Sequence, residues 1–324
     1  MSGGESRSFA LDPGIARFVD HMMSGANPGC IPIAELRSGA AARRKPLNAG
    51  GPVMAETRDL LVPAEDIPAA VRLHMPATPP SGRVIVYVHG GGWTIGSIET
   101  HDRVMREHAA ATGAVVAGVG YALAPEAPYP AALMQVVAVV RWLAAGGVPE
   151  LAEVVVAGDS AGANLALAAC LYLRDCGGPL PRAALLAYGA FDPALDSPSC
   201  HAYGDAGLIL GADRMRMFWK CYLGERPEAA DAYAAPARAD LAGLPPVHLV
   251  IAEHDILRDE NLGLAARLAD AGNPAEHRVY PGTTHAFLEA VGMAEPSRRA
   301  IDDQAAWLGR TLGSPPVEPV PGGV

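Results

Sequence analysis

The stretch that most constrains the fold is Gly158-Asp-Ser-Ala-Gly162, which lies between a strand-like and a helix-like segment. Before it, residues 154–157 form a short β-branched apolar run, which is typical of a buried strand. After it, residues 164–174 are rich in Leu and Ala and predict a buried helix. Gly-x-Ser-x-Gly between a strand and a helix is typical of a sharp turn that exposes the serine hydroxyl. The glycines are needed because such a turn leaves no room for a β-carbon on either side.

By itself this motif is a weak signal, because 36 of the 324 residues are Gly. The rest of the chain supports it by alternating between strand-like and helix-like segments. The candidate strands are 57–62, 69–75, 84–88, 114–119, 154–157, 183–188, 247–252 and 275–280. The candidate helices are 101–111, 131–145, 164–174, 260–271 and 296–312. This alternation predicts an α/β fold with a mostly parallel sheet and helices on both faces.

One long interruption breaks the alternation. Between Phe191 and Leu244 the pattern predicts no strand and a single helix, 213–223. An insertion of this size, which leaves the sheet just after one strand, suits a cap over a site at the strand ends. Residues 1–50 lack strand-like alternation and are expected to be an appendage to the core.

Composition excludes several classes of partner. The formal net charge is −10 and the pI is about 5.4, so neither nucleic acid nor an anionic membrane surface is an expected partner. The most apolar window, 131–145, is too short to span a bilayer, and the polar N-terminus lacks the apolar core of a signal peptide. Five cysteines without a Cys-x-x-Cys pair are expected to be buried or free thiols in a reducing compartment. The expected location is the cytoplasm.

A second motif, His89-Gly-Gly-Gly-Trp93, directly follows the strand that ends at Val88. Three consecutive glycines let the backbone approach a ligand, whereas a plain tight turn would need fewer. Together with the serine turn, this motif is typical of the oxyanion-hole loop of esterases and lipases. We expect the N–H groups of Gly91, Gly92 and Ala161 to stabilise the negative charge of a tetrahedral intermediate.

The general base and its partner are predicted from chain order, which in this arrangement is serine, acid, histidine. His285 lies in a loop after a candidate strand and is the predicted base, while His277 lies within that strand. Asp255 follows the strand 247–252 and is the predicted orienting acid, with Glu253 as the rival. Asp259 and Glu260 stand where the next helix begins, so we expect them to cap it.

Metal and nucleotide sites are not expected. The sequence has no His-x-x-x-His or Cys-x-x-Cys spacing, and the Gly run lacks the Lys-Ser/Thr that would follow in a phosphate loop. For the acyl pocket, Trp93, Tyr188 and Phe191 are the candidate walls together with the cap, although bulky groups of this kind also pack in cores.

The motifs together resemble those of the bacterial hormone-sensitive-lipase-like (family IV) esterases of the α/β-hydrolase superfamily. The resemblance rests on His89–Trp93, Tyr121–Glu126 followed by Tyr129–Ala132, Gly158–Gly162, Asp255–Glu260 and His285–Phe287, in family order. It implies the α/β-hydrolase fold with a helical cap. It also implies that the chain hydrolyses short- to medium-chain carboxylic esters without a cofactor.

The same resemblance implies a division of the chain. The hydrolase core would comprise residues 51–191 and 236–313, and the cap would combine residues 1–50 with the insertion 192–235. Residues 314–324 are rich in Pro and Gly and are expected to form a flexible tail.

Two positions depart from the family pattern. Ala122 stands where the pattern has arginine, which removes a charge that could pair with Glu126 and leaves the support of that loop open. Ala163 replaces a common glycine after the serine turn, which is a small change on a helix.

The predicted reaction is ester hydrolysis through an acyl-enzyme: Ser160 attacks the carbonyl, His285 transfers the proton and Asp255 orients His285. The same residues could open a lactone or cleave an activated amide. A non-catalytic small-molecule receptor on this fold is the alternative from another class, although such a receptor is expected to have lost one of the three residues. The expected partner is a small-molecule ester, and a homodimer is the other association considered.

Overall fold

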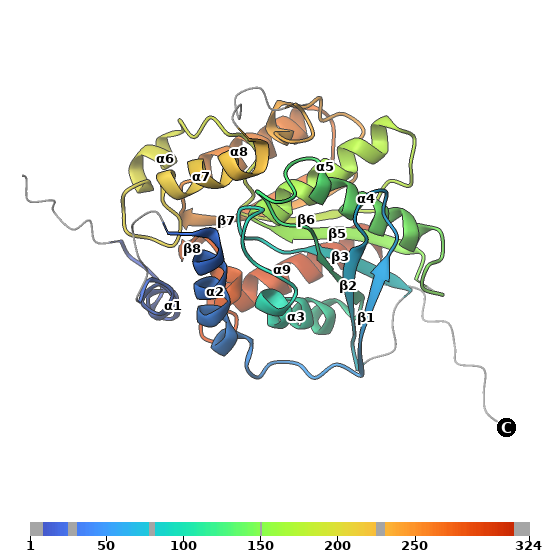
Figure 1. Cartoon of the computed structure of the whole chain (residues 1–324), viewed down its shortest axis with the longest axis horizontal. Helices are drawn as coiled ribbons and strands as arrows, with labels where there is room; N and C mark the ends of the chain where they lie inside the picture. The colour runs from blue at the N-terminus through green and yellow to red at the C-terminus, as the bar shows by residue number, and fades with distance from the viewer. Residues whose placement is uncertain (1–8, 25–30, 78–81, 150, 225–230, 314–324) are drawn as a thin grey trace, which may run out of the picture.

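An eight-stranded sheet forms the centre of the molecule, in the order β1-β2-β4-β3-β5-β6-β7-β8 (Figure 1). The computed structural model describes residues 9–24, 31–77, 82–149, 151–224 and 231–313. The strands are β1 (Glu56–Val62), β2 (Ala69–Met75), β3 (Arg83–Val88), β4 (Val115–Gly120), β5 (Glu153–Asp159), β6 (Ala184–Ala187), β7 (Val247–His254) and β8 (Ala275–Thr284). The predicted tail 314–324 lies outside the described residues.

The sheet is mostly parallel, as the alternation predicts. The pairs β1–β2 and β2–β4 are antiparallel, whereas every pair from β4 through β3 to β8 is parallel. Each candidate strand is present, but β5, β7 and β8 extend beyond their predicted ends. The carboxyl ends of β5, β7 and β8 therefore meet at one edge of the sheet, where ligands bind in open α/β folds.

Helices cover both faces of the sheet (Figure 1). They are α1 (Pro13–Met23), α2 (Ile33–Arg44), α3 (Asp102–Thr112), α4 (Ala131–Ala144), α5 (Ala161–Asp175), α6 (Pro198–Tyr203), α7 (Ala212–Leu223), α8 (Arg258–Asp270) and α9 (Glu295–Leu312). On β3, Val84 and Val86 belong to the buried cluster that includes residues of α4, α5 and α8, while Ile85 and Tyr87 belong to the cluster that includes residues of α1, α3 and α9. A continuous apolar strand is thus buried on both sides, as expected for a parallel sheet.

The insertion after β6 contains the predicted helix, which is α7, and a further short helix, α6, that the sequence pattern does not predict. Ser197 caps α6 by accepting the N–H of Cys200 at 3.2 Å, and a proline occupies its first turn. Figure 1 shows α6 and α7 approaching β7 and β8 from one side, and α1 and α2 approaching them from the other. Within the described ranges, no helix combines the length and the hydropathy that crossing a bilayer requires.

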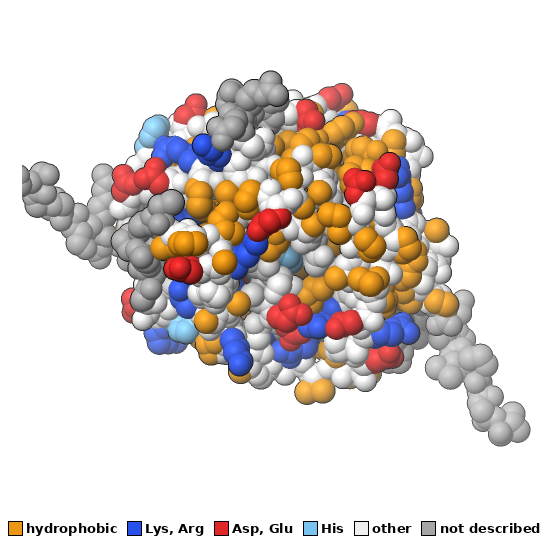
Figure 2. Space-filling model, in the orientation of Figure 1, with side chains coloured by type: hydrophobic (Ala, Val, Ile, Leu, Met, Phe, Trp, Pro, Cys, Tyr) orange, Lys and Arg blue, Asp and Glu red, His pale blue; other side chains and the backbone are white. Residues whose placement is uncertain are grey.

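Hydrophobic side chains also reach the surface, and Figure 2 shows them gathered around α4, α5 and the β1–β2 hairpin. On this hairpin, Leu61 and Ile67 are exposed. Exposed apolar area of this kind is common on folded chains and identifies no partner by itself. The homodimer therefore stays a prediction.

Helix α2 is attached to the loops after β3 and β4 by one arginine. Arg37 donates from Nε to the carbonyl of Thr94 at 2.8 Å and from Nη2 to that of Ala124 at 2.9 Å. Its guanidinium also pairs with both carboxylate oxygens of Glu126, at 2.9 and 2.6 Å. Glu126 thus has a cationic partner although Ala122 carries no charge, because the arginine comes from a helix that is remote in sequence. The open question about the support of this loop is answered by Arg37.

Replacing Arg37 should destabilise the protein. In Arg37→Ala two backbone carbonyls lose a charged donor, and we expect the free energy of unfolding to fall by about 1–3 kcal/mol. The exposed part of the Glu126 pair contributes little to this loss. Denaturant unfolding measures the change. Arg17→Ala is the control, since Arg17 makes one exposed hydrogen bond, 3.3 Å from the carbonyl of Met293. Equal losses in the two variants would contradict the anchoring role of Arg37.

Candidate active site

Ser160 occupies a strained turn between β5 and α5. Its φ is +53°, in the left-handed region that non-glycine residues seldom adopt. The glycines on either side are required by close packing. A β-carbon on Gly162 would lie 1.9 Å from the carbonyl oxygen of Val88, and one on Gly158 would lie 2.5 Å from the backbone of Gly162. The turn therefore presses against the end of β3, and this contact fixes where the serine hydroxyl points.

A chain of two hydrogen bonds joins Ser160, His285 and Asp255. The Oγ of Ser160 is 2.9 Å from Nε2 of His285, and Nδ1 of the same ring is 2.7 Å from Oδ2 of Asp255. All three are buried, and Asp255 is 2% exposed. The N–H of Leu257 donates to the other oxygen of Asp255 at 3.0 Å, so the carboxylate is held in place. With Nδ1 donating to Asp255, Nε2 is free to accept the serine proton, which is the arrangement of a nucleophile and its general base.

Strand length explains why these residues meet. Because β7 extends to His254 and β8 to Thr284, Asp255 and His285 directly follow their strands instead of lying further along loops. The register of β7 and β8 shifts between Ala252 and His254.

The rivals considered for the base and the acid lie elsewhere. His277 is exposed on β8, and Glu253 accepts the N–H of Gly282 at 2.7 Å. Neither makes a hydrogen bond to the chain formed by Ser160, His285 and Asp255 in the described structure.

The prediction that Asp259 and Glu260 cap α8 is wrong. No side chain caps α8, and both carboxylates reach across to the insertion instead. Asp259 accepts the N–H of Ser199 at 2.8 Å. Glu260 accepts the N–H groups of Phe191 and Asp192, the second at 2.7 Å. Since α8 begins at Arg258, both side chains lie in its first turn, where they supply acceptors for the start of the insertion.

The glycine loop after β3 is packed closely against its neighbours. A β-carbon on Gly91 would lie 2.1 Å from the carbonyl of Ile95, and one on Gly92 would lie 2.2 Å from the ring of Phe218 on α7. Their φ values, +120° and +56°, are also ones that glycine adopts without strain. Ala161 is the first residue of α5, so its N–H has no acceptor within the helix. The backbone donors predicted for the oxyanion thus lie in a close-packed loop and at a helix start.

Asp159 links the glycine loop to the serine turn, a role that the sequence analysis missed. It is 2% exposed, and its Oδ1 accepts the hydroxyl of Tyr87 at 2.9 Å and the N–H of Gly90 at 3.0 Å. Burial raises the pKa of Asp159, but the nearby ring of His101 and the hydrogen bonds outweigh burial, so its pKa is lowered overall. A charged residue directly before the serine, inside an apolar strand, is the signal that could have indicated this role.

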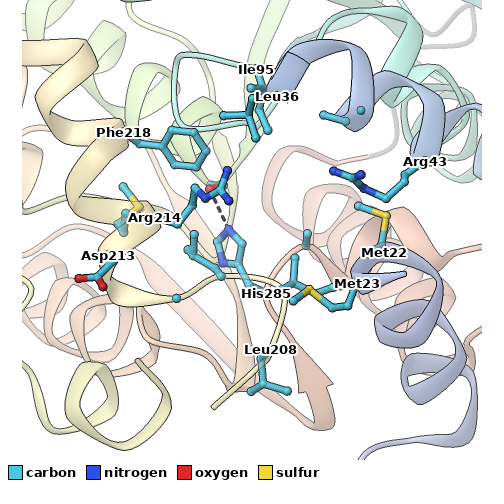
Figure 3. A pocket seen from close by; sticks show the side chains of 18 of the residues that line it. Met22, Met23, Leu36, Arg43, Ile95, Leu208, Asp213, Arg214, Phe218 and His285 are labelled. Atoms are coloured by element: carbon cyan, nitrogen blue, oxygen red, sulfur yellow. Dashed lines mark hydrogen bonds between the residues drawn. The ribbon is translucent and has the colours of Figure 1, made fainter. Parts of the chain in front are cut away.

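A cavity of about 640 Å³ opens above Ser160 and His285 (Figure 3). Its walls come from α1, α2 and residues 204–218 of the insertion. Among the apolar residues that line it are Met22, Met23, Leu36, Ile95, Leu208, Leu210, Met215 and Phe218. A size in this range is typical of small-molecule sites.

The three predicted pocket walls do not line this cavity. Trp93, Tyr188 and Phe191 are each at most 1% exposed. Trp93 stacks on Tyr222 with ring centroids 4.3 Å apart, and Tyr188 packs edge-on against His285 at 5.0 Å. These residues support the site from within the core. The segments expected to form the cap do line this cavity, but their individual residues were not named, because no local motif connects them to the serine.

Comparison with known proteins gives concordant matches. A family model described as the alpha/beta hydrolase fold matches residues 85–289. An acetyl esterase of Salmonella schwarzengrund is 34% identical over 320 residues, which covers 94% of this chain and 98% of that protein. The structure of a hyperthermophilic esterase from Pyrobaculum calidifontis has a TM-score of 0.88 and 31% identity, covering 94% of this chain and 100% of that one. An esterase of the bacterial hormone-sensitive lipase family has a TM-score of 0.83 and 28% identity, covering 94% and 100%.

The close contact of Gly162 with β3 gives a prediction. Gly162→Ala should destabilise the protein and displace the serine turn, because its β-carbon would overlap the carbonyl oxygen of Val88. Denaturant unfolding should show a loss of more than about 2 kcal/mol, as expected for overpacking at a rigid backbone contact.

The control is Gly263→Ala. Gly263 is exposed on α8 and a β-carbon there meets nothing within 4 Å, so we expect a gain of about 0.5–1 kcal/mol. A loss for Gly162→Ala no larger than about 0.5 kcal/mol would show that the turn tolerates a β-carbon.

Proposed function

This chain belongs to the family that carries the alpha/beta hydrolase fold, and we propose that it is a carboxylesterase whose nucleophile is Ser160. The predicted resemblance to hormone-sensitive-lipase-like esterases is confirmed by the relatives and by the fold. The observation that carries the residue assignment is the hydrogen-bonded chain from Ser160 through His285 to Asp255. A complete chain of this kind supports catalysis and not the alternative of a receptor that binds without turnover.

In the proposed mechanism, His285 accepts the proton of Ser160 as Oγ attacks the ester carbonyl. Asp255 keeps the Nδ1–H tautomer and stabilises the imidazolium that forms. The alcohol leaves with the proton from His285, and water then attacks the acyl-enzyme by the same route to release the carboxylic acid. Throughout, the negative charge on the carbonyl oxygen is stabilised by backbone N–H groups.

For that oxyanion hole we propose the N–H groups of Gly91, Gly92 and Ala161. Asp159 supports this geometry because its carboxylate accepts the N–H of Gly90 and because it directly precedes Ser160 in sequence. One residue thus fixes both the loop that carries the donors and the nucleophile. Removal of one such donor typically lowers the rate about 10²–10³-fold.

We propose that residues 1–50 and 192–235 together form a cap over the core, which comprises 51–191 and 236–313. The support is that the described parts of both segments line the same cavity. The cap is attached to the core by Arg37 on one side and by Asp259 and Glu260 on the other. Substrates would therefore enter a site that is walled on two sides by cap residues.

The cytoplasm stays the proposed location. In the part of the chain that the structure describes, Cys170, Cys176, Cys200 and Cys221 are free, which supports a reducing compartment. Cys30 lies outside the described residues.

The triad assignment predicts a sharp contrast between two neighbouring acids. Ser160→Ala and Asp255→Asn should each lower kcat for an aryl acetate by about 10⁴-fold or more, because one removes the nucleophile and the other the tautomer control. Glu253→Gln is the matched control and should remain active, since Glu253 binds the backbone of Gly282. Steady-state assays, with folding checked by circular dichroism, measure all three. An inactive Glu253→Gln together with an active Asp255→Asn would reverse the assignment of the acid.

Acyl length is the second prediction about function. The cavity is walled by α1, α2 and the insertion, so an acyl group that has filled it gains no further burial per added methylene. Across a series of aryl esters from acetate to palmitate, kcat/KM should peak below about eight acyl carbons and fall steeply beyond about ten. A preference for long acyl chains, with activation once the substrate forms an interface, would contradict a closed acyl pocket.

A further inference from the structure

Two arginines face the cavity that contains Ser160. Arg43 comes from α2 and Arg214 from α7, and Figure 3 shows both side chains extending into the cavity from opposite walls. The chain as a whole has a net charge of −10, so this is a local concentration of positive charge on an acidic protein. Ester hydrolysis as proposed above uses neither residue.

Neither guanidinium is neutralised within the described structure. No carboxylate of the described residues lies within ion-pair distance of Arg43 or Arg214, and Nε of Arg43 is buried without a hydrogen-bond partner. Burial, the charge of Arg44 and the charge of Arg214 all lower the pKa of Arg43. A buried donor without a protein partner and a second cation nearby both favour the binding of an anion at this place.

The other charged side chains around the cavity do not compensate the positive charge of Arg43 and Arg214. Arg44 is paired with the buried carboxylate of Glu289 at 2.7 Å, so its charge is compensated. Asp213 pairs with Arg216 at 2.7 Å. The remaining carboxylates of the lining, Glu35 and Asp205, are exposed.

A glycine in the interior of α2 makes room for the guanidinium of Arg43. A β-carbon on Gly39 would lie 3.3 Å from Nη1 of Arg43, so the guanidinium lies against the bare helix backbone one turn earlier. Glycine in a helix interior costs up to about 1 kcal/mol relative to alanine. Here it lets the guanidinium lie closer to the helix, since a β-carbon would require the side chain to shift by a few tenths of an ångström.

We infer that the cavity selects esters that carry a free, ionised carboxylate in addition to the ester group. Arg43 and Arg214 bind this carboxylate while Ser160 attacks the ester. This inference rests on the proposed function. A planar guanidinium presents paired donors that match the two oxygens of a carboxylate, and two guanidinium groups can share one anion. Binding removes the repulsion between the two cations and supplies the missing acceptor for Arg43.

The test compares matched pairs of esters that differ in one charge. On the acyl side, para-nitrophenyl hydrogen adipate is compared with para-nitrophenyl hexanoate. On the alcohol side, para-acetoxybenzoate is compared with its methyl ester. For each pair the ratio of kcat/KM, anionic over neutral, is measured in the wild type and in Arg43→Met/Arg214→Met.

We expect the double substitution to lower this ratio by about tenfold or more for at least one pair, which also identifies the side of the ester that bears the anion. Arg216→Met is the matched control, because Arg216 is on the same helix α7, pairs with Asp213 and does not line the cavity. It should leave both ratios unchanged. Ratios that survive the double substitution, or that fall equally in the control, would overturn the inference.

A second measurement separates this inference from the proposed function. Calorimetric titration of Ser160→Ala with adipate reports carboxylate binding without turnover, and adding the two arginine substitutions should weaken it about tenfold or more. Absent turnover of every neutral and anionic ester by the wild type, with adipate still bound through the arginines, would contradict the proposed function alone. Adipate binding that does not depend on the arginines would overturn the carboxylate site alone.

Discussion

The active geometry depends on a backbone contact between the start of α5 and the end of β3. Gly162 lies so close to the carbonyl of Val88 that no other residue type fits, and the same contact sets the positive φ of Ser160. Asp159 extends the contact by binding the N–H of Gly90 on the loop that continues β3. The nucleophile and the oxyanion loop are therefore positioned by the same contact between the ends of β3 and β5, which are neighbouring parallel strands. The acid and the histidine follow β7 and β8, further along the sheet.

The sequence was sufficient for the parts of the molecule whose patterns are local. Apolar runs of strand length, the glycines around Ser160 and the chain order of the motifs predicted the sheet and the hydrogen-bonded chain to His285 and Asp255. Strand ends were less accurate, because His254 and Thr284 continue the pairing of β7 and β8 although neither residue extends an apolar run.

What the sequence did not reveal is non-local. The partner of Glu126 is Arg37, 89 positions earlier, and nothing in either local pattern connects the two. The resemblance implied that residues 1–50 and 192–235 cover the site, but not which of their side chains line the cavity, since α1, α2 and the insertion meet only in the folded chain. Trp93, Tyr188 and Phe191 were misassigned because bulky residues near a site look alike in sequence, whether they support it from the core or line it.

The contact between Gly92 and Phe218 joins the cavity wall to the oxyanion loop. The phenyl ring of Phe218 occupies the space that a β-carbon of residue 92 would need, so α7 packs directly against the oxyanion loop and supports its conformation. Any displacement of α7 that widens the entrance also withdraws that ring, and the loop then loses its support. The oxyanion loop is therefore fully supported only while α7 stays packed against it, so the cavity wall and the catalytic loop are held by the same helix.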